Sequence, residues 1–131
     1  MVAILSPRYV LTHAPVLLKE VVEYLAVQPG GRYVDCTTGA GGHARAVLEA
    51  SSPGGLLLGL DADPVAIEIA SENLDQFGDS LRLVQANFRD LKRICRRNSF
   101  VPVHGVLFDH GMSSMQLADA RDAYAHALEL D

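Results

Sequence analysis

Three aspartates that each end a short apolar run are the residues best suited to chemistry in this chain. They are Asp35, after the run at 33–34, Asp61, after the run at 56–60, and Asp109, after the run at 105–108. A carboxylate accepts hydrogen bonds from hydroxyl and ammonium groups. In open α/β sheets, ligands bind beyond the carboxyl ends of the strands, which is where acids that end strands would lie.

A glycine-rich turn follows the first of these acids. Glycines stand at positions 39, 41 and 42, and a run typical of a helix extends from His43 to Ala50. Glycine adopts backbone angles closed to other residues and lets a ligand approach the main chain. The unpaired N–H groups at the start of the helix would point into the turn. Strand, glycine turn and helix together predict a site for a nucleotide-type cofactor.

The remaining elements alternate in the same way. We predict four strands, which lie near 33–36, at 56–60, at 81–85 and at 105–108. We predict helices from Pro15 to about Leu25, at 43–50, from Asp63-Pro64 to about Leu74, and around 89–97, because apolar residues recur there at helical spacing. Residues 1–14 show no periodicity and are expected to form an extended lead-in. The alternation predicts a single α/β domain over 1–131, with a parallel sheet and helices on both faces.

Composition sets further bounds. The chain has 131 residues, 49% of them hydrophobic, as expected of one folded domain. It has no apolar run of the roughly 18 residues that would span a bilayer, and no secretory signal is evident, so we expect a soluble intracellular protein. We predict no metal site, and the two cysteines, Cys36 and Cys95, are expected to be buried free thiols. A net charge of −5 argues against binding nucleic acid through the overall field, although one basic cluster lies at 92–97.

Two interpretations of the glycine turn remain open. The pattern Gly39-x-Gly41-x-x-Ala44, with Asp61 about 20 residues beyond it, satisfies a relaxed dinucleotide fingerprint, in which Asp61 binds the adenosine ribose. S-adenosylmethionine would use the same Asp61 but has no pyrophosphate. Asp35 favours S-adenosylmethionine, because a carboxylate leading into the turn repels a pyrophosphate and suits an ammonium group and a nearby sulfonium.

The chain also resembles a known family, the ribosomal small-subunit RNA cytidine N4-methyltransferases of bacteria and their mitochondrial relatives. Five segments carry the resemblance, in order: His13-Ala-Pro-Val-Leu-Leu-Lys-Glu20, Tyr33-Val-Asp-Cys-Thr-Thr-Gly-Ala-Gly-Gly-His43, Leu60-Asp-Ala-Asp-Pro64, Asn87-Phe-Arg-Asp90 and Val106-Leu-Phe-Asp-His-Gly-Met-Ser-Ser-Met-Gln-Leu117. Each is ordinary alone, and five in order are specific. The resemblance implies a Rossmann-like class I methyltransferase fold, S-adenosylmethionine as cofactor, and small-subunit ribosomal RNA or an assembly intermediate as partner. It places the protein in the cytoplasm if bacterial, or in the mitochondrial matrix if eukaryotic.

The resemblance also implies roles for individual residues. Gly41, Gly42 and His43 would contact the cofactor at the turn, which begins at Gly39. Asp61 would hold the ribose, Phe88 would lie near the adenine, and Asp109 and Gln116 would close the site. Asp109 is also the best-placed carboxylate to guide the cytosine amine, and it is the one catalytic residue that we predict.

The chain departs from the family pattern near its end. His110 stands where the family usually has leucine, and Ala118 stands where an acid is common. The family's later strands and its helical RNA-recognition domain have no counterpart up to Asp131. We therefore expect part of the family's sheet, with the strand at 105–108 at an open edge unless the tail or a partner covers it. The first hypothesis is the methyltransferase that the resemblance implies. The departures motivate a second, a non-catalytic relative that acts in small-subunit assembly. The third, based on the dinucleotide fingerprint, is a small NAD-binding domain.

Overall fold

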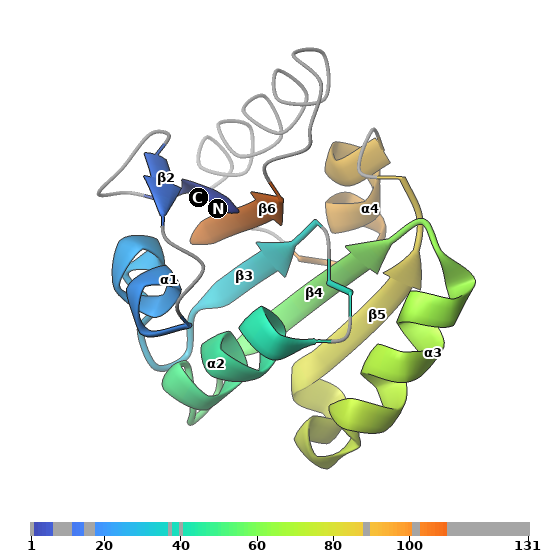
Figure 1. Ribbon diagram of the computed structural model, residues 1–131, viewed down its shortest axis with the longest axis horizontal. Helices are drawn as coiled ribbons and strands as arrows, with labels where there is room; N and C mark the ends of the chain where they lie inside the picture. Colours follow the sequence, from blue (N-terminus) through green and yellow to red (C-terminus); the bar gives the residue numbers. More distant parts are fainter. Residues whose placement is uncertain are drawn as a thin grey trace.

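A mixed sheet with helices on both faces forms the centre of the molecule (Figure 1). The computed structural model describes residues 2–6, 12–14, 18–36, 38–39, 41–87, 90–100 and 103–109. The strands are β1 (Val2–Leu5), β2 (Thr12–Ala14), β3 (Arg32–Asp35), β4 (Leu56–Asp61), β5 (Leu81–Gln85) and β6 (Gly105–Asp109). The helices are α1 (Leu18–Leu25), α2 (Gly42–Ala50), α3 (Pro64–Asn73), the 3₁₀ segment η1 (Asp75–Ser80) and α4 (Leu91–Arg97).

The sheet has six strands in the order β2-β1-β6-β3-β4-β5. The neighbours β6-β3-β4-β5 pair in parallel, and they are the four strands that the sequence predicts. Their order matches part of a doubly wound sheet: β3, the first of these four strands along the chain, lies between two of the others. The predicted α/β fold with a four-stranded parallel sheet is confirmed for this part of the chain.

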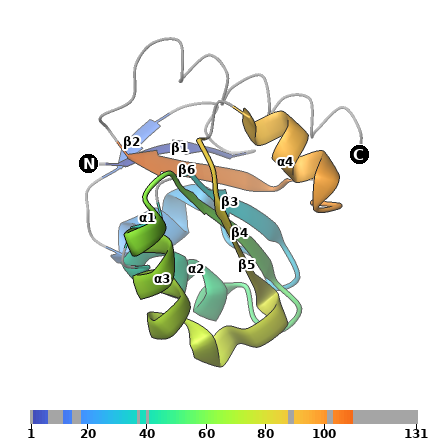
Figure 2. The same cartoon turned by 90° about the vertical axis from the view of Figure 1, so that its right-hand side faces the viewer.

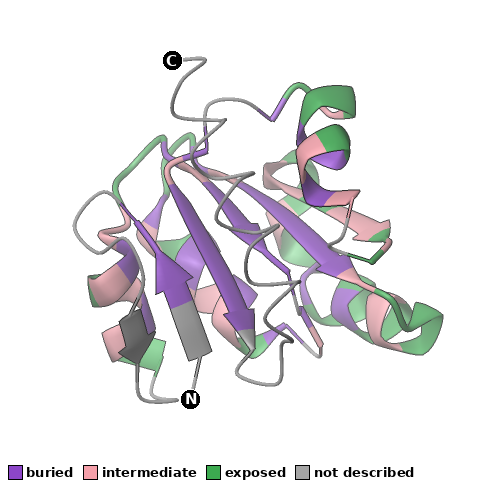
Figure 3. Ribbon diagram, turned by 90° about the horizontal axis from the view of Figure 1, so that it is seen from above, coloured by how far each residue is buried: buried purple, intermediate pink, exposed green. Residues whose placement is uncertain are grey.

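The helices divide between the two faces as expected (Figure 2). On one face, α1, α2 and α3 pack through Val21, Val47 and Ala70 against side chains from the central strands. On the other face, α4 is the helix that packs among the described residues, through Ile94 and Cys95. The central strands are buried along most of their length, whereas β5, at the edge, is half-exposed (Figure 3). The predicted burial of both cysteines is confirmed.

The amino-terminal segment differs from the extended lead-in that the sequence predicts. Residues 2–5 form β1, which pairs antiparallel with β6, and residues 12–14 form β2, which pairs antiparallel with β1. Ile4 and Leu5 are fully buried, one in each of the two apolar clusters. The expectation that β6 would present an open edge is therefore wrong, because β1 satisfies that edge with main-chain hydrogen bonds.

The start of α1 also departs from expectation. Leu18 is one of the apolar residues that recur at helical spacing in this segment, but its side chain is 46% exposed. Val21 and Leu25, one turn and two turns further on, are buried against β1 and α2 instead. The predicted beginning of the helix at Pro15 lies outside the described residues. Among those residues, no helix combines the length and apolar character needed to cross a bilayer.

Candidate functional site

The carboxyl edge of the parallel sheet has a step at its centre. Asp35 ends β3 and pairs with Gly59 of β4 on one side and with Leu107 of β6 on the other. The neighbouring strands each continue for two more residues, to Asp61 and to Asp109. A strand rises by about 3.3 Å per residue, so Asp35 is set back by about 7 Å between two longer neighbours. The three acids predicted to end strands do so, and the strand order places them side by side.

Asp61 connects the end of β4 to the glycine turn. Its Oδ2 accepts a hydrogen bond from the Gly39 N–H at 3.0 Å, and its Oδ1 accepts one from the Asp63 N–H at 3.0 Å. Each carboxylate oxygen keeps a lone pair after these contacts. Because the side chain remains half-exposed, those lone pairs are available to hydroxyl groups of a ligand. The N–H groups of Gly39 and Asp63 therefore hold the Asp61 carboxylate in one orientation.

Backbone geometry explains why glycine occupies the start of α2. Gly41 precedes the helix with a φ of 96°, and a Cβ built on it would lie 2.8 Å from Leu74 Cδ1. Gly41 is therefore required by both backbone and packing. Gly42 and Gly39 differ, because a Cβ on either would have no heavy atom of the described structure within 4 Å. These two positions present bare main chain to open space, as a turn that contacts a ligand should.

Asp35 is a buried acid at this edge, with its side chain 2% exposed. Its main-chain carbonyl accepts a hydrogen bond from Thr38 Oγ1 at 3.2 Å, which tightens the turn after β3. The carboxylate also acts on its neighbour. The pKa of the Cys36 thiol is raised well above its usual value, first by burial and then by the charge of Asp35. A buried negative group at the base of the step favours a cationic group over an anionic one.

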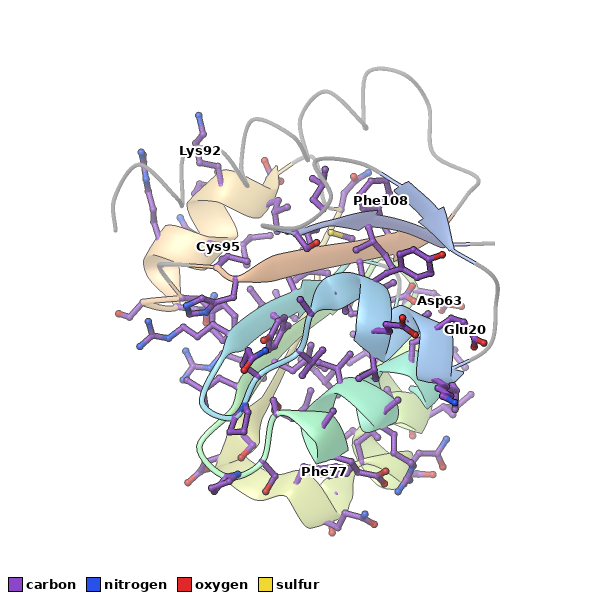
Figure 4. The ribbon with its side chains drawn as sticks, turned by 90° about the vertical axis from the view of Figure 1, so that its left-hand side faces the viewer. Glu20, Asp63, Phe77, Lys92, Cys95 and Phe108 are labelled. Carbon is purple, nitrogen blue, oxygen red and sulfur yellow. The ribbon has the colours of Figure 1, made fainter. Side chains whose placement is uncertain are left out.

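The first turns of α1 and α2 also lie at this edge. Because β2 and β6 both pair antiparallel with β1, Ala14 ends at the same edge as Asp109, and α1 follows β2. Figure 4 shows Glu20, in the first turn of α1, at the same end of the sheet as Asp63. Its Oε2 is shielded from solvent and has no hydrogen-bond partner among the described residues. His43, the second residue of α2, is half-buried.

Sequence reasoning assigned Glu20 no role. The residue sits inside the first of the five family-like segments, but nothing in its spacing distinguishes it from a solvated acid on a helix. Only the tertiary structure shows that one of its oxygens is shielded from water.

Some of the predicted site residues lie in the described part of the chain, and others lie outside it. The structure brings together Asp35, Gly39, Gly41, Gly42, His43 and Asp61. The backbone of Asp109 ends β6 beside β3, while its side chain lies outside the described part. Phe88, Gln116 and the departures at His110 and Ala118 also lie outside the described residues, so their roles remain predictions.

A cleft at the other end of the strands is separate from this site. It has a volume of about 320 Å³ and is lined by the loop at 26–31 together with Tyr33 and His104. Two of its side chains form hydrogen bonds with the backbone. Tyr33 Oη accepts from the Gln28 N–H at 2.8 Å, and His104 Nδ1 accepts from the Arg32 N–H at 2.9 Å. The predicted site residues that the structure describes lie at the carboxyl edge, away from this cleft.

Sequence comparison supplies a family. Residues 10–131 match the profile of the MraW methylase family. A protein of Dehalococcoides mccartyi named ribosomal RNA small subunit methyltransferase H is 56% identical over 117 residues, which cover 89% of this chain and 34% of that protein. A protein of Thermomicrobium roseum with the same name is 48% identical over 117 residues, covering 89% and 36%. The chain thus spans about a third of the length of these relatives.

Comparison with solved structures agrees on the fold. TrmN from Thermus thermophilus superposes with a TM-score of 0.53 at 28% identity, over 60% of this chain and 24% of that chain. An rRNA methylase from Streptococcus thermophilus superposes with a TM-score of 0.51 at 21% identity, over 62% and 46%. Both cover only part of this chain, and they support the Rossmann-like architecture derived above.

Proposed function

The chain belongs to the MraW methylase family, and we propose that it is the S-adenosylmethionine-binding part of an enzyme that methylates N4 of a cytidine in small-subunit ribosomal RNA. One observation carries the proposal. The glycine turn is hydrogen-bonded through Gly39 to Asp61 and starts from the buried acid Asp35. A nucleoside with a cationic amino-acid tail matches such an arrangement at both ends.

The residues present fit this cofactor better than a dinucleotide. The half-exposed Asp61 offers acceptor lone pairs to the two hydroxyls of a ribose. Bare backbone at Gly39 and Gly42 leaves room for the ligand to approach the turn. Asp35 would attract an ammonium group and would repel a pyrophosphate. The NAD-binding hypothesis and the assembly-factor hypothesis gain no support from the comparisons.

Within this proposal, Asp35 and Glu20 receive the ammonium group. Asp35 lies at the base of the step, and Glu20 Oε2 is an acceptor shielded from water at the same edge. A charged group that pairs with a carboxylate away from solvent interacts more strongly than it does in water. The two acids would fix the amino-acid end of the cofactor, while Asp61 fixes the nucleoside end.

Bound S-adenosylmethionine supplies an electrophilic methyl group on a sulfonium. The chain's contribution to transfer is placement and charge control. A cytosine from structured RNA must be splayed out of its stack to enter such a pocket. Asp109, at the end of β6 next to Asp35, would accept a hydrogen bond from the exocyclic amine and orient its lone pair toward the methyl. This carboxylate, or water, would accept the proton that the amine gives up when it takes the methyl group from the sulfonium.

Calorimetry tests the cofactor assignment. We expect S-adenosylmethionine to bind and NAD not to bind. In the Asp35→Asn variant, affinity for S-adenosylmethionine should fall by about tenfold or more, which is the order of one charge-assisted contact. Affinity for 5′-methylthioadenosine, which lacks the amino-acid tail, should not change. An Asp61→Asn variant should have lower affinity for both ligands. Binding of NAD without binding of S-adenosylmethionine would overturn the proposal.

A second experiment tests the reaction. Radiolabelled methyl transfer to small-subunit RNA should be lost in Asp109→Asn while cofactor binding persists. Digestion of the labelled RNA to nucleosides should place the label on N4 of cytidine. A label on another nucleoside would overturn the cytidine assignment and leave the cofactor assignment standing.

A further inference from the structure

The charges of the helices are segregated between the two faces of the sheet. The face covered by α1, α2 and α3 carries two cations in those helices, Lys19 and Arg45, against five carboxylates, which are Glu20, Glu23, Glu49, Glu68 and Glu72. The helix on the opposite face, α4, carries four cations and no acid within its bounds. The described helices therefore differ in charge between the two faces, although the net charge of the chain is only −5.

The cations of α4 are Lys92, Arg93, Arg96 and Arg97, four of the eleven lysines and arginines in the chain. Leu91, Ile94 and Cys95 are buried against the sheet, so the basic residues occupy the outer side of the helix. Figure 4 shows Lys92 pointing away from the sheet, opposite to Cys95. The three arginines are exposed. This arrangement defines a basic surface, which here means these four residues of α4.

Among the described residues, Asp90 is an acid that lies beside this basic surface. Asp90, just before α4, pairs with Arg93 at 3.2 Å, but the two side chains are 45% and 61% exposed. An exposed pair of this kind is weak and is readily exchanged for another anion. The exposed Arg96 and Arg97 lie in the last turn of the helix, beyond this pair.

We propose that the outer side of α4 binds the phosphate backbone of the RNA substrate while the target base enters the carboxyl edge of the sheet. This inference rests on the proposed function, from which it takes the RNA. A guanidinium group can donate two parallel hydrogen bonds to two oxygens of one phosphate group. The opposite face repels a polyanion, so RNA that reaches the edge approaches from the α4 side. Since α4 follows β5, its first turn, with Lys92 and Arg93, lies toward the carboxyl edge, and Arg97 lies away from it.

Salt dependence of RNA binding tests the inference with the full chain. The probe is a fluorescein-labelled 20-nucleotide single-stranded RNA, measured by anisotropy between 25 and 200 mM KCl. Each phosphate contact contributes about 0.7 to the slope of log affinity against log salt for a single strand. Arg97→Gln should reduce that slope by about 0.7, and Arg93→Gln with Arg97→Gln by up to about 1.4. The loss should be similar for RNAs of different sequence, because phosphate contacts carry no sequence information.

A matched variant controls for net charge. Arg45→Gln removes one arginine from the opposite face, where Arg45 lies over Phe77 and donates to the Asn73 carbonyl. Its RNA slope should equal that of the unchanged protein. A slope reduced as much as in Arg97→Gln would overturn the inference, since net charge alone would then explain binding. Calorimetry with S-adenosylmethionine should give the same affinity in all these variants, which separates this inference from the cofactor proposal. Retained cofactor binding with no RNA binding, or equal competition by polyglutamate, would also overturn it.

Discussion

The main-chain N–H of Gly39 donates a hydrogen bond to Oδ2 of Asp61, 22 residues further along the chain. This contact joins the turn after β3 to the end of β4 across the parallel pair that the two strands form. The same carboxylate accepts from the Asp63 N–H through its other oxygen. A ligand that binds Asp61 therefore binds a group already oriented by two backbone donors, and little ordering entropy remains to be lost.

Substitution of Asp61 by asparagine should destabilise the fold as well as weaken the cofactor. An amide has one acceptor oxygen, so one of the two backbone donors loses its partner and faces an NH₂ group. We expect a loss of about 1 kcal/mol in the free energy of unfolding, measured by urea denaturation. The control is Asp63→Asn, because Asp63 caps α3 through Val65 and asparagine caps equally well. Equal destabilisation by both changes would contradict the role given to Asp61.

Two adjacent glycines should respond in opposite ways to alanine. Gly41→Ala should cost about 1–2 kcal/mol, because φ is positive and the new methyl meets Leu74. Gly42→Ala should stabilise the fold by about 0.4–1 kcal/mol, since the position is helical and the methyl enters open space. Under the proposed function, the same Gly42→Ala change should weaken S-adenosylmethionine binding, because that open space is where the ligand approaches the turn. Thermal denaturation and calorimetry on the same samples give both quantities, and unchanged affinity in Gly42→Ala would remove this residue from the site.

The amino-terminal strand should contribute measurably to stability. Ile4 is fully buried with Val21 and Leu25, so Ile4→Ala should cost about 2–5 kcal/mol. Leu18, another apolar residue of the amino-terminal part, is exposed, and Leu18→Ala should change stability by less than about 0.5 kcal/mol. Denaturant midpoints of the two variants check this. A small effect at Ile4 would mean that β1 does not hold the edge of β6.

Alkaline pH should destabilise the protein through its buried thiols. Burial raises the pKa of Cys95 to about 12, from an ordinary value near 9, and raises the pKa of Cys36 in the same direction. The folded state keeps these protons longer than the unfolded state, so their contribution is complete below about pH 9. It is lost as pH rises from 9 toward 12. Each thiol adds up to about 1.4 kcal/mol per pH unit to the slope.

The Cys95→Ala variant tests this linkage. Its stability at pH 7 should be lower, because the side chain is buried, but its stability should fall less steeply between pH 9 and pH 10.5. The slopes rather than the absolute values carry the comparison. Parallel slopes for the variant and the unchanged protein would show that Cys95 does not titrate as its burial requires.

Local features of the sequence were enough to predict the four parallel strands and the acids at their ends. Three of the strands contain a short apolar run that stops at an acid, whereas the strand at 81–85 mixes apolar and polar residues and ends at Gln85. Asp63 capping α3 and Gly41 before α2 are further examples, because caps depend on a few neighbouring residues. The right-handed crossover then leaves few ways to order such strands.

Contacts between distant residues required the tertiary structure. The pairing of β1 with β6 joins residues about a hundred positions apart. The four residues of β1 are too few to show a periodicity that would predict this pairing. The exposure of Leu18, the sheltered oxygen of Glu20 and the two-residue step at Asp35 all depend on how α1 and the strand ends meet. Which residues end strands and begin helices follows from a few neighbouring residues and can be predicted locally. Which of them face one another depends on strand register and packing between residues far apart in the chain, so it required the folded structure.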